Sequence, residues 1–214
     1  HYLFDMIRET WAGSGDSRLW EMCWSAADTD IDSDRALGQS PHYLTRPSKE
    51  TWLLALEAWN GEQLSKKQKE RPNVPEKTKA LLKYVYSAIV PVMEDEGVEF
   101  ELEHLIPVAQ AARIIRANPE DEGWPLSAIG NLALFPKALN RIKGENFIGD
   151  YLEASQGTSN ELSAAERDKT QALVMAPLID EIRFDPGMSK ESFEAFCNQR
   201  FGVITEVLLS NLGY

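Results

Sequence analysis

Residues 98–107 read VEFELEHLIP. From Val98 to Glu103 apolar and acidic residues alternate, and this period of two predicts a half-buried strand, because successive side chains of a strand point to opposite faces. Pro107 favours a turn soon after His104, since a proline disfavours helical geometry in the residue before it. We expect that turn to bring the carboxylate of Glu103 and the imidazole of His104 to one site.

A second segment, residues 129–140, reads IGNLALFPKALN. Within it, 131–135 is expected to form a second short strand, and the residues that follow, 136–143, a helix. Asn140 lies nine positions beyond Asn131 and therefore falls on that helix. The two segments together predict two strands and a helix around one small site.

Most of the remaining chain has the pattern of helices. Apolar residues recur at helical spacing and predict helices over 1–12, 17–27, 48–59, 76–94, 108–117, 161–182 and 189–210. The polar stretch 61–76 contains two prolines and is expected to form a loop. The expected fold class is α+β and mostly helical, with a small ββα motif embedded between helical segments. We expect a helical N-terminal segment (1–97), a central core (98–150) and a helical C-terminal segment that packs on the core (151–214).

The formal net charge of the chain is −12. An acidic protein is repelled by nucleic acid at long range, which argues against a protein that coats DNA. A nuclease remains compatible with this charge, because charges can segregate along the chain. The stretch 137–143 holds Lys137, Arg141 and Lys143 without any acid.

The composition also bears on the cellular compartment. No apolar run approaches the roughly 20 residues that a membrane-spanning helix needs, and no signal peptide is visible. Cys23 and Cys197 lie far apart and form no CxxC metal site, so we expect two reduced thiols. These features predict a cytoplasmic protein without a membrane partner. Because the sequence begins at His1 rather than Met, we expect a further domain upstream.

The adjacent acid and imidazole suit the hydrolysis of a phosphodiester. A water must lose a proton, and a neutral histidine such as His104 is a suitable base. Negative charge develops on the phosphate and the leaving oxygen, and a hard cation such as Mg²⁺ stabilises it. This cation takes oxygen ligands, often only one or two carboxylates or amides completed by water and phosphate. Glu103 supplies one such ligand, and a second must come from elsewhere in the chain.

The ordered set of Glu103-His104, Asn131 and Asn140 resembles the motif of the HNH nucleases, also called ββα-metal or His-Me finger nucleases. In that motif an acid–His pair ends a first strand, an asparagine stands near a second strand, and a His or Asn ligand lies on the following helix. The longer text ELEHLIP…IGNLALF…LNRIKGENF is similar to the C-terminal HNH domain of GmrSD-type modification-dependent restriction enzymes and their relatives in phage defence. The distinctive motifs cover about residues 99–148.

By position, the resemblance implies a role for each of these residues. Glu103 stands where many HNH enzymes have aspartate and is expected to be a metal ligand, with Asn140 as the second ligand. His104 is expected to be the general base that activates water. Asn131 is expected to tie the loop and to orient His104 through a hydrogen bond to the backbone or to the imidazole.

The resemblance also implies partners. Lys137, Arg141 and Lys143 are expected to neutralise phosphates, with Asn146 as a weaker phosphate or loop contact. We expect double-stranded DNA as the substrate and Mg²⁺ as the cofactor, with Mn²⁺ or another divalent cation as a substitute. GmrSD-like proteins usually carry an NTP-dependent domain before the nuclease. No GxxxxGK[ST] phosphate-binding loop occurs in this chain, so an NTPase or sensor is expected upstream or in a partner chain.

Other interpretations stay open. A single histidine in a strand is usually structural, a Gly-Asn pair is a common turn, and a basic cluster is often only a solvated face. A second class of function is a non-catalytic nucleic-acid-binding or regulatory module that retains the HNH fold. A third is an all-helical interaction protein in which the motif arose by chance. Five tryptophans are expected in a core rather than in a base-stacking platform: Trp11, Trp20, Trp24, Trp52 and Trp59.

Overall fold

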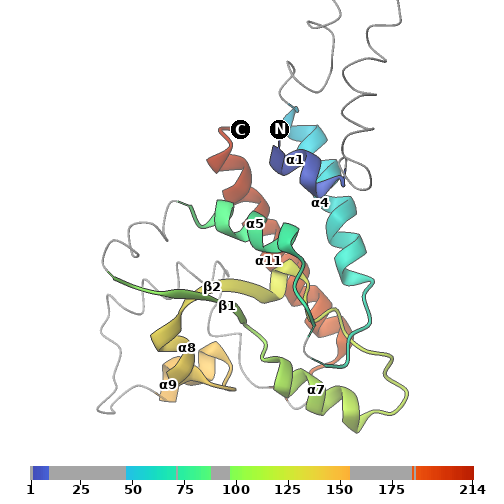
Figure 1. The fold of residues 1–214 in the computed structure, drawn as a ribbon. Helices are drawn as coiled ribbons and strands as arrows, with labels where there is room; N and C mark the ends of the chain where they lie inside the picture. The colour runs from blue at the N-terminus through green and yellow to red at the C-terminus, as the bar shows by residue number, and fades with distance from the viewer. Residues whose placement is uncertain (1, 10–46, 71, 88–96, 155–184, 186) are drawn as a thin grey trace, which may run out of the picture. The chain divides into compact units, whose positions relative to one another are not determined.

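The computed structural model describes residues 2–9, 47–70, 72–87, 97–154, 185 and 187–214. In this part of the chain the fold is α+β and mostly helical, with a two-stranded antiparallel sheet (Figure 1). The expected fold class is confirmed at this level. The chain forms two compact units, His1–Trp59 and Asn60–Tyr214. The segment boundaries expected near residues 97 and 150 stay a prediction, and the helices expected over 17–27 and 161–182 lie outside the described residues.

The first unit contains α1 (Tyr2–Ile7) and the first part of α4 (Lys49–Leu64). The ring of Phe4 meets the ring of Trp52 edge-on, with their centroids 4.9 Å apart. Trp52 and Trp59 are both buried, so the expectation that they lie in a core is confirmed. The other three tryptophans of that prediction lie outside the described residues: Trp11, Trp20 and Trp24.

Helix α4 extends further than the sequence predicts. The loop expected from residue 61 onward begins only after Leu64, so the prediction was wrong for these four residues. Asn60 and Gln63 occupy buried positions at helical spacing, and the amide of Asn60 donates a hydrogen bond to Asn198 at 2.7 Å. Their polarity alone would place both amides in a surface loop. Both are buried instead, and Asn60 has an amide partner on another helix.

Serine side chains cap the first turn of two helices. The backbone N–H of Thr51 donates to Ser48 Oγ at 3.2 Å at the start of α4. In the same way, the N–H of Ser192 donates to Ser189 Oγ at 3.2 Å at the start of α11 (Lys190–Asn211). Each bond satisfies an N–H group that has no partner within the helix.

The two strands are β1 (Phe100–His104) and β2 (Leu132–Pro136). They pair antiparallel, with Phe100 opposite Pro136 and His104 opposite Leu132. Both lie within two residues of the predicted strands, so the two strand predictions are confirmed. His104 is therefore the last residue of β1, where the chain turns away from the sheet.

Helices follow both strands directly (Figure 1). After β1 the chain enters α7 (Val108–Ala117), and after β2 it enters α8 (Lys137–Lys143) and then α9 (Ile148–Ala154). Helix α8 packs against both strands, whereas α5 (Glu76–Val85) packs against β2 and α11. Helix α5 ends at Val85, short of the predicted helix over 76–94, and residues 88–94 of that prediction lie outside the described residues. No helix among the described residues is both long and apolar enough to span a membrane.

The last helix, α11, approaches the turn before β2 with almost no space between the two backbones. This turn is the short helix η1 (Ile129–Asn131). A Cβ atom added to Gly130 would lie 2.1 Å from the carbonyl oxygen of Cys197. Glycine at this position is therefore required by the close approach of α11.

Arg200 fixes the same turn from within the core. Its side chain is completely buried, and its Nη1 donates to the carbonyls of Ile129 at 3.3 Å, of Gly130 at 3.1 Å and of Leu132. Its Nη2 donates to the hydroxyl of Tyr86 at 3.1 Å. Burial lowers the pKa of Arg200 and raises the pKa of Tyr86. A buried guanidinium thus supplies the hydrogen bonds that the carbonyls of this turn require.

We expect Gly130→Ala to lower the free energy of unfolding by about 1–3 kcal/mol, because the new methyl group forces two backbones apart. The matched control is Gly202→Ala on α11, where an added Cβ meets nothing within 4 Å. That change should stabilise the helix by roughly 0.5–1 kcal/mol. Urea denaturation followed by circular dichroism measures both. Equal effects of the two substitutions would contradict the close approach of α11.

Candidate active site

Three pairs of side chains connect α8 to β1 and to Glu99, the residue directly before β1. Lys137 Nζ lies 2.7 Å from Glu99, the amide nitrogen of Asn140 donates to Glu101 at 2.8 Å, and Lys143 Nζ lies 2.7 Å from Glu103. The strand contributes every second residue, because these share one face. The helix contributes every third residue, because residues three apart are neighbours on the surface of a helix. We call these pairs the β1–α8 ladder.

The β1–α8 ladder runs from solvent into the protein. The side chain of Glu99 is 73% exposed, whereas that of Glu103 is 15% exposed and that of Lys143 only 1%. Lys137 lowers the pKa of Glu99 through a hydrogen bond and its charge. Lys143 Nζ also donates to the carbonyls of Gly144 at 3.3 Å and of Asn146 at 3.1 Å. The pair of Lys143 and Glu103 is therefore an enclosed ion pair, and the ammonium group of Lys143 contacts three oxygen atoms.

Asn131 ties the two halves of the motif together. It is fully buried, and its Oδ1 accepts a hydrogen bond from the N–H of Ile106 at 2.8 Å. Its Nδ2 donates to the carbonyls of Ile106 at 3.3 Å and of Leu126 at 3.1 Å. The N–H of Leu105 donates to the carbonyl of Asn131 at 2.9 Å. These bonds hold the two residues that directly follow His104, so Asn131 acts on His104 through the backbone.

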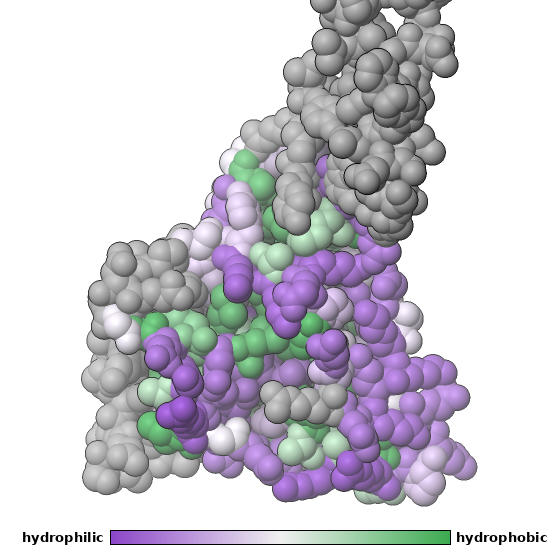
Figure 2. Space-filling view, in the orientation of Figure 1, coloured by the Kyte–Doolittle hydropathy of each residue, from purple (hydrophilic) through white to green (hydrophobic). Residues whose placement is uncertain are grey.

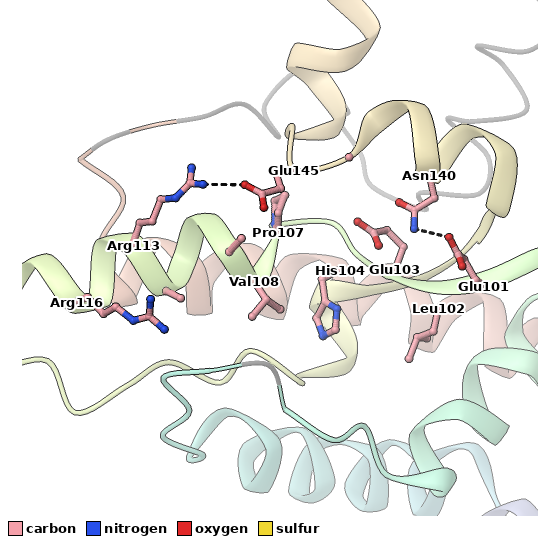
Figure 3. A pocket seen from close by; sticks show the side chains of 13 residues that line it. Glu101, Leu102, Glu103, His104, Pro107, Val108, Arg113, Arg116, Asn140 and Glu145 are labelled. Carbon is pink, nitrogen blue, oxygen red and sulfur yellow. Dashed lines mark hydrogen bonds and ion pairs between the residues drawn. The ribbon is translucent and has the colours of Figure 1, made fainter.

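Glu103 and His104 border the same cavity from opposite faces of β1. The cavity has a volume of about 660 Å³ and lies between β1, α7 and the end of α8. In Figure 3 the carboxylate of Glu103 and the ring of His104 leave the strand in opposite directions, as expected for neighbours in a strand. His104 is 9% exposed. The turn at Pro107 was expected to bring the two side chains together, but they stay on opposite faces of β1. Both nevertheless border the same cavity.

Asn140 also borders the cavity, with its amide held in a defined orientation. The carboxylate of Glu101 only accepts hydrogen bonds, so the nitrogen of the amide must face it. The amide oxygen of Asn140 then points away from Glu101, and in Figure 3 it points to the side on which the carboxylate of Glu103 lies. Glu101 therefore decides which atom of Asn140 is available to a cation.

The donor atoms around the cavity fit a hard divalent cation. Glu101 and Glu103 offer carboxylate oxygens and Asn140 an amide oxygen, and these are the ligand types that Mg²⁺ and Mn²⁺ prefer. The described residues contain no group of three or more His, Cys, Asp or Glu side chains that could hold a metal ion. A site for Mg²⁺ needs only one or two carboxylates when water and substrate complete the shell. The carboxylate of Glu103 and the amide oxygen of Asn140 meet that requirement, while Glu101 holds the amide.

The residues expected to contact nucleic acid do not gather at this cavity. Lys137 and Lys143 belong to the β1–α8 ladder, and Lys143 is enclosed. Arg141 and Asn146 are exposed, and none of these four residues borders the cavity. The cations that do border it are Arg113 and Arg116 of α7 (Figure 3).

Sequence reasoning therefore missed several residues of the site. The sequence assigns no role to Glu101, although it shares a strand face with Glu103. Arg113 and Arg116 had no assigned role, although they are the only charged residues in 108–117. The sequence contained a signal in both cases. Glu101 lies two residues before Glu103 on the predicted strand, and the helix that carries the two arginines contains no acid.

Comparisons with known proteins identify no relative of this chain. No family model matches it, and neither a curated protein nor a solved structure matches it.

We expect Asn131→Ala to lower the free energy of unfolding by about 2 kcal/mol or more, because it leaves several buried backbone groups without partners. Asn73→Ala, which removes an exposed amide in a loop, should change it by no more than about 0.5 kcal/mol. Thermal or urea denaturation of the two variants measures the difference. A stability loss that is equally small in both would show that the amide of Asn131 does not hold the turn.

Proposed function

We propose that this chain is a metal-dependent DNA endonuclease of the HNH class, in which a water activated by His104 hydrolyses a phosphodiester. By resemblance to the GmrSD-type enzymes, it serves as the nuclease domain of a restriction or phage-defence protein. The observation that carries the proposal is the meeting of Glu103, His104 and Asn140 at one cavity. These residues come from a strand and a later helix in the order that the resemblance implies.

Each residue has a distinct task in the proposed reaction. His104 accepts a proton from the attacking water, and its position at the end of β1 is fixed by the bonds of Asn131 to the next two residues. Glu103 and Asn140 hold the cation, and Glu101 orients the amide of Asn140. A bound Mg²⁺ supplies stabilisation of the negative charge that develops on the phosphate.

One feature favours the alternative, a module that keeps the fold without catalysis. The ammonium group of Lys143 already lies 2.7 Å from Glu103 in an enclosed position, where it balances the charge that a metal ion would balance. A protein that uses this pair only for stability would bind nucleic acid or a partner without cleaving. Metal binding separates the two functions, because only the nuclease needs Glu103 as a ligand.

The direct test is cleavage of plasmid DNA by the purified chain with Mg²⁺ or Mn²⁺, beside His104→Ala. Loss of a general base should lower the rate by roughly 10²–10⁴-fold. Lys79→Gln is the surface control, since Lys79 forms an exposed ion pair with Glu76 and does not border the cavity. Equal cleavage by the chain and His104→Ala would refute the mechanism. Metal-dependent DNA binding without cleavage would favour the non-catalytic module.

A second test concerns the positioning role of Glu101. Glu101→Leu removes the acceptor that fixes the amide of Asn140, and we expect it to weaken Mn²⁺ binding by about 10–100-fold. Glu101→Gln retains a carbonyl acceptor and should weaken binding less. Electron paramagnetic resonance of free Mn²⁺ measures both affinities without requiring activity. Equal losses in the two variants would mean that the charge of Glu101, rather than its hydrogen bond, matters.

A further inference from the structure

The cavity has two walls of opposite charge. Acid and amide side chains of the β1–α8 ladder line one wall, and Arg113 and Arg116 line the other, which is formed by α7. Both arginines are seen at the α7 side of the cavity in Figure 3. In Figure 2 the surface over α7 and the loop that follows it is predominantly hydrophilic. A ligand in this cavity would meet cation-binding oxygens on one side and guanidinium groups on the other.

Helix α7 carries a net positive charge in an acidic protein. The chain as a whole has a net charge of −12, yet α7 contains two arginines and no acid. Arg113 and Arg116 are three positions apart and therefore share one helix face. Ala109 and Ala112 lie on the same face and also line the cavity. Small side chains beside the exposed arginines leave room for a ligand against the helix.

The present partners of these arginines bind them only weakly. Arg113 lies 2.8 Å from Glu145, and Arg116 lies 3.8 Å from Glu70. All four side chains are more than half exposed, and exposed ion pairs contribute about 0–1 kcal/mol. A phosphate diester offers the guanidinium a bidentate, charge-assisted partner instead. Ligand phosphates can therefore displace both glutamates.

We propose that Arg113 and Arg116 form a binding site for successive phosphates of a DNA strand, and that Glu145 competes with DNA for Arg113. The choice of DNA as the ligand rests on the proposed nuclease function. The two guanidinium groups hold the strand along α7, so that the phosphodiester to be cleaved lies between them and the acid wall. Glu145, which follows α8 directly after Gly144, occupies Arg113 until DNA arrives.

The test uses a fluorescently labelled DNA duplex and the full chain carrying His104→Ala, with Mg²⁺ and again with a chelator. Fluorescence anisotropy gives the affinity over a series of salt concentrations. Arg113→Gln and Arg116→Gln should each weaken binding about tenfold at low salt and reduce the salt slope by about 1. Lys79→Gln removes one charge from an exposed pair elsewhere and should leave the slope unchanged.

Glu145→Gln should strengthen DNA binding, whereas the two arginine substitutions should weaken it. If Glu145 competes with DNA, this variant binds the duplex a few times more tightly than the parent. In the Arg113→Gln background the same change should have no effect, because the competition then has no target. The corresponding control is Glu76→Gln, which frees Lys79 in the same way and should not strengthen binding.

The outcomes for the arginine site and for the nuclease can be told apart. An unchanged slope in both arginine variants, or no binding of the duplex in either condition, overturns the arginine site. If the chain with His104 intact cleaves DNA and its arginine variants keep the same KM, the nuclease stands and the arginine site falls. If binding depends on both arginines while no cleavage occurs, the arginine site stands and the nuclease falls.

Discussion

The carbonyl groups of the turn before β2 lie in the core and need hydrogen-bond donors there. Arg200 satisfies them from α11, and the amide of Asn131 satisfies the backbone of the loop after β1. An unpaired polar group in such a place costs about 1–3 kcal/mol, so both side chains stabilise the turn. The last helix and the first strand are thereby joined at one turn, although they are far apart in the sequence.

The geometry of the candidate site depends on this turn. Asn131 holds the residues that follow His104, and the strand that starts after Asn131 carries the chain into α8. The β1–α8 ladder then sets the position of α8 against the strand, which places Asn140 beside Glu101. The site is thus assembled by two separate sets of polar contacts, one at each end of β2.

The local elements of this region could be predicted from the sequence, because each rests on a local pattern. Alternation predicts β1, and the apolar runs predict β2 and the helices around them. Side-chain pairing across elements was missed, since it depends on how α8 lies on the strand, which no local period specifies. Arg200 occupies a buried position on α11 at the same spacing as Phe193 and Cys197, but a charged residue in an apolar stripe is usually assigned to the surface. The buried amides of α4 were missed for the same reason.

The repeat distances of the β1–α8 ladder limit its length. Two residues of a strand advance by about 6.7 Å, whereas three residues of a helix advance by about 4.5 Å and turn through roughly 300°. Each further pair would therefore be displaced by about 2 Å along the axis and rotated by roughly 60°. A strand and a helix can keep such a match over only a few pairs, and α8 ends at Lys143, which forms the third. By these distances a longer α8 would gain no further partner on β1, so the ladder stays short whatever the length of the helix.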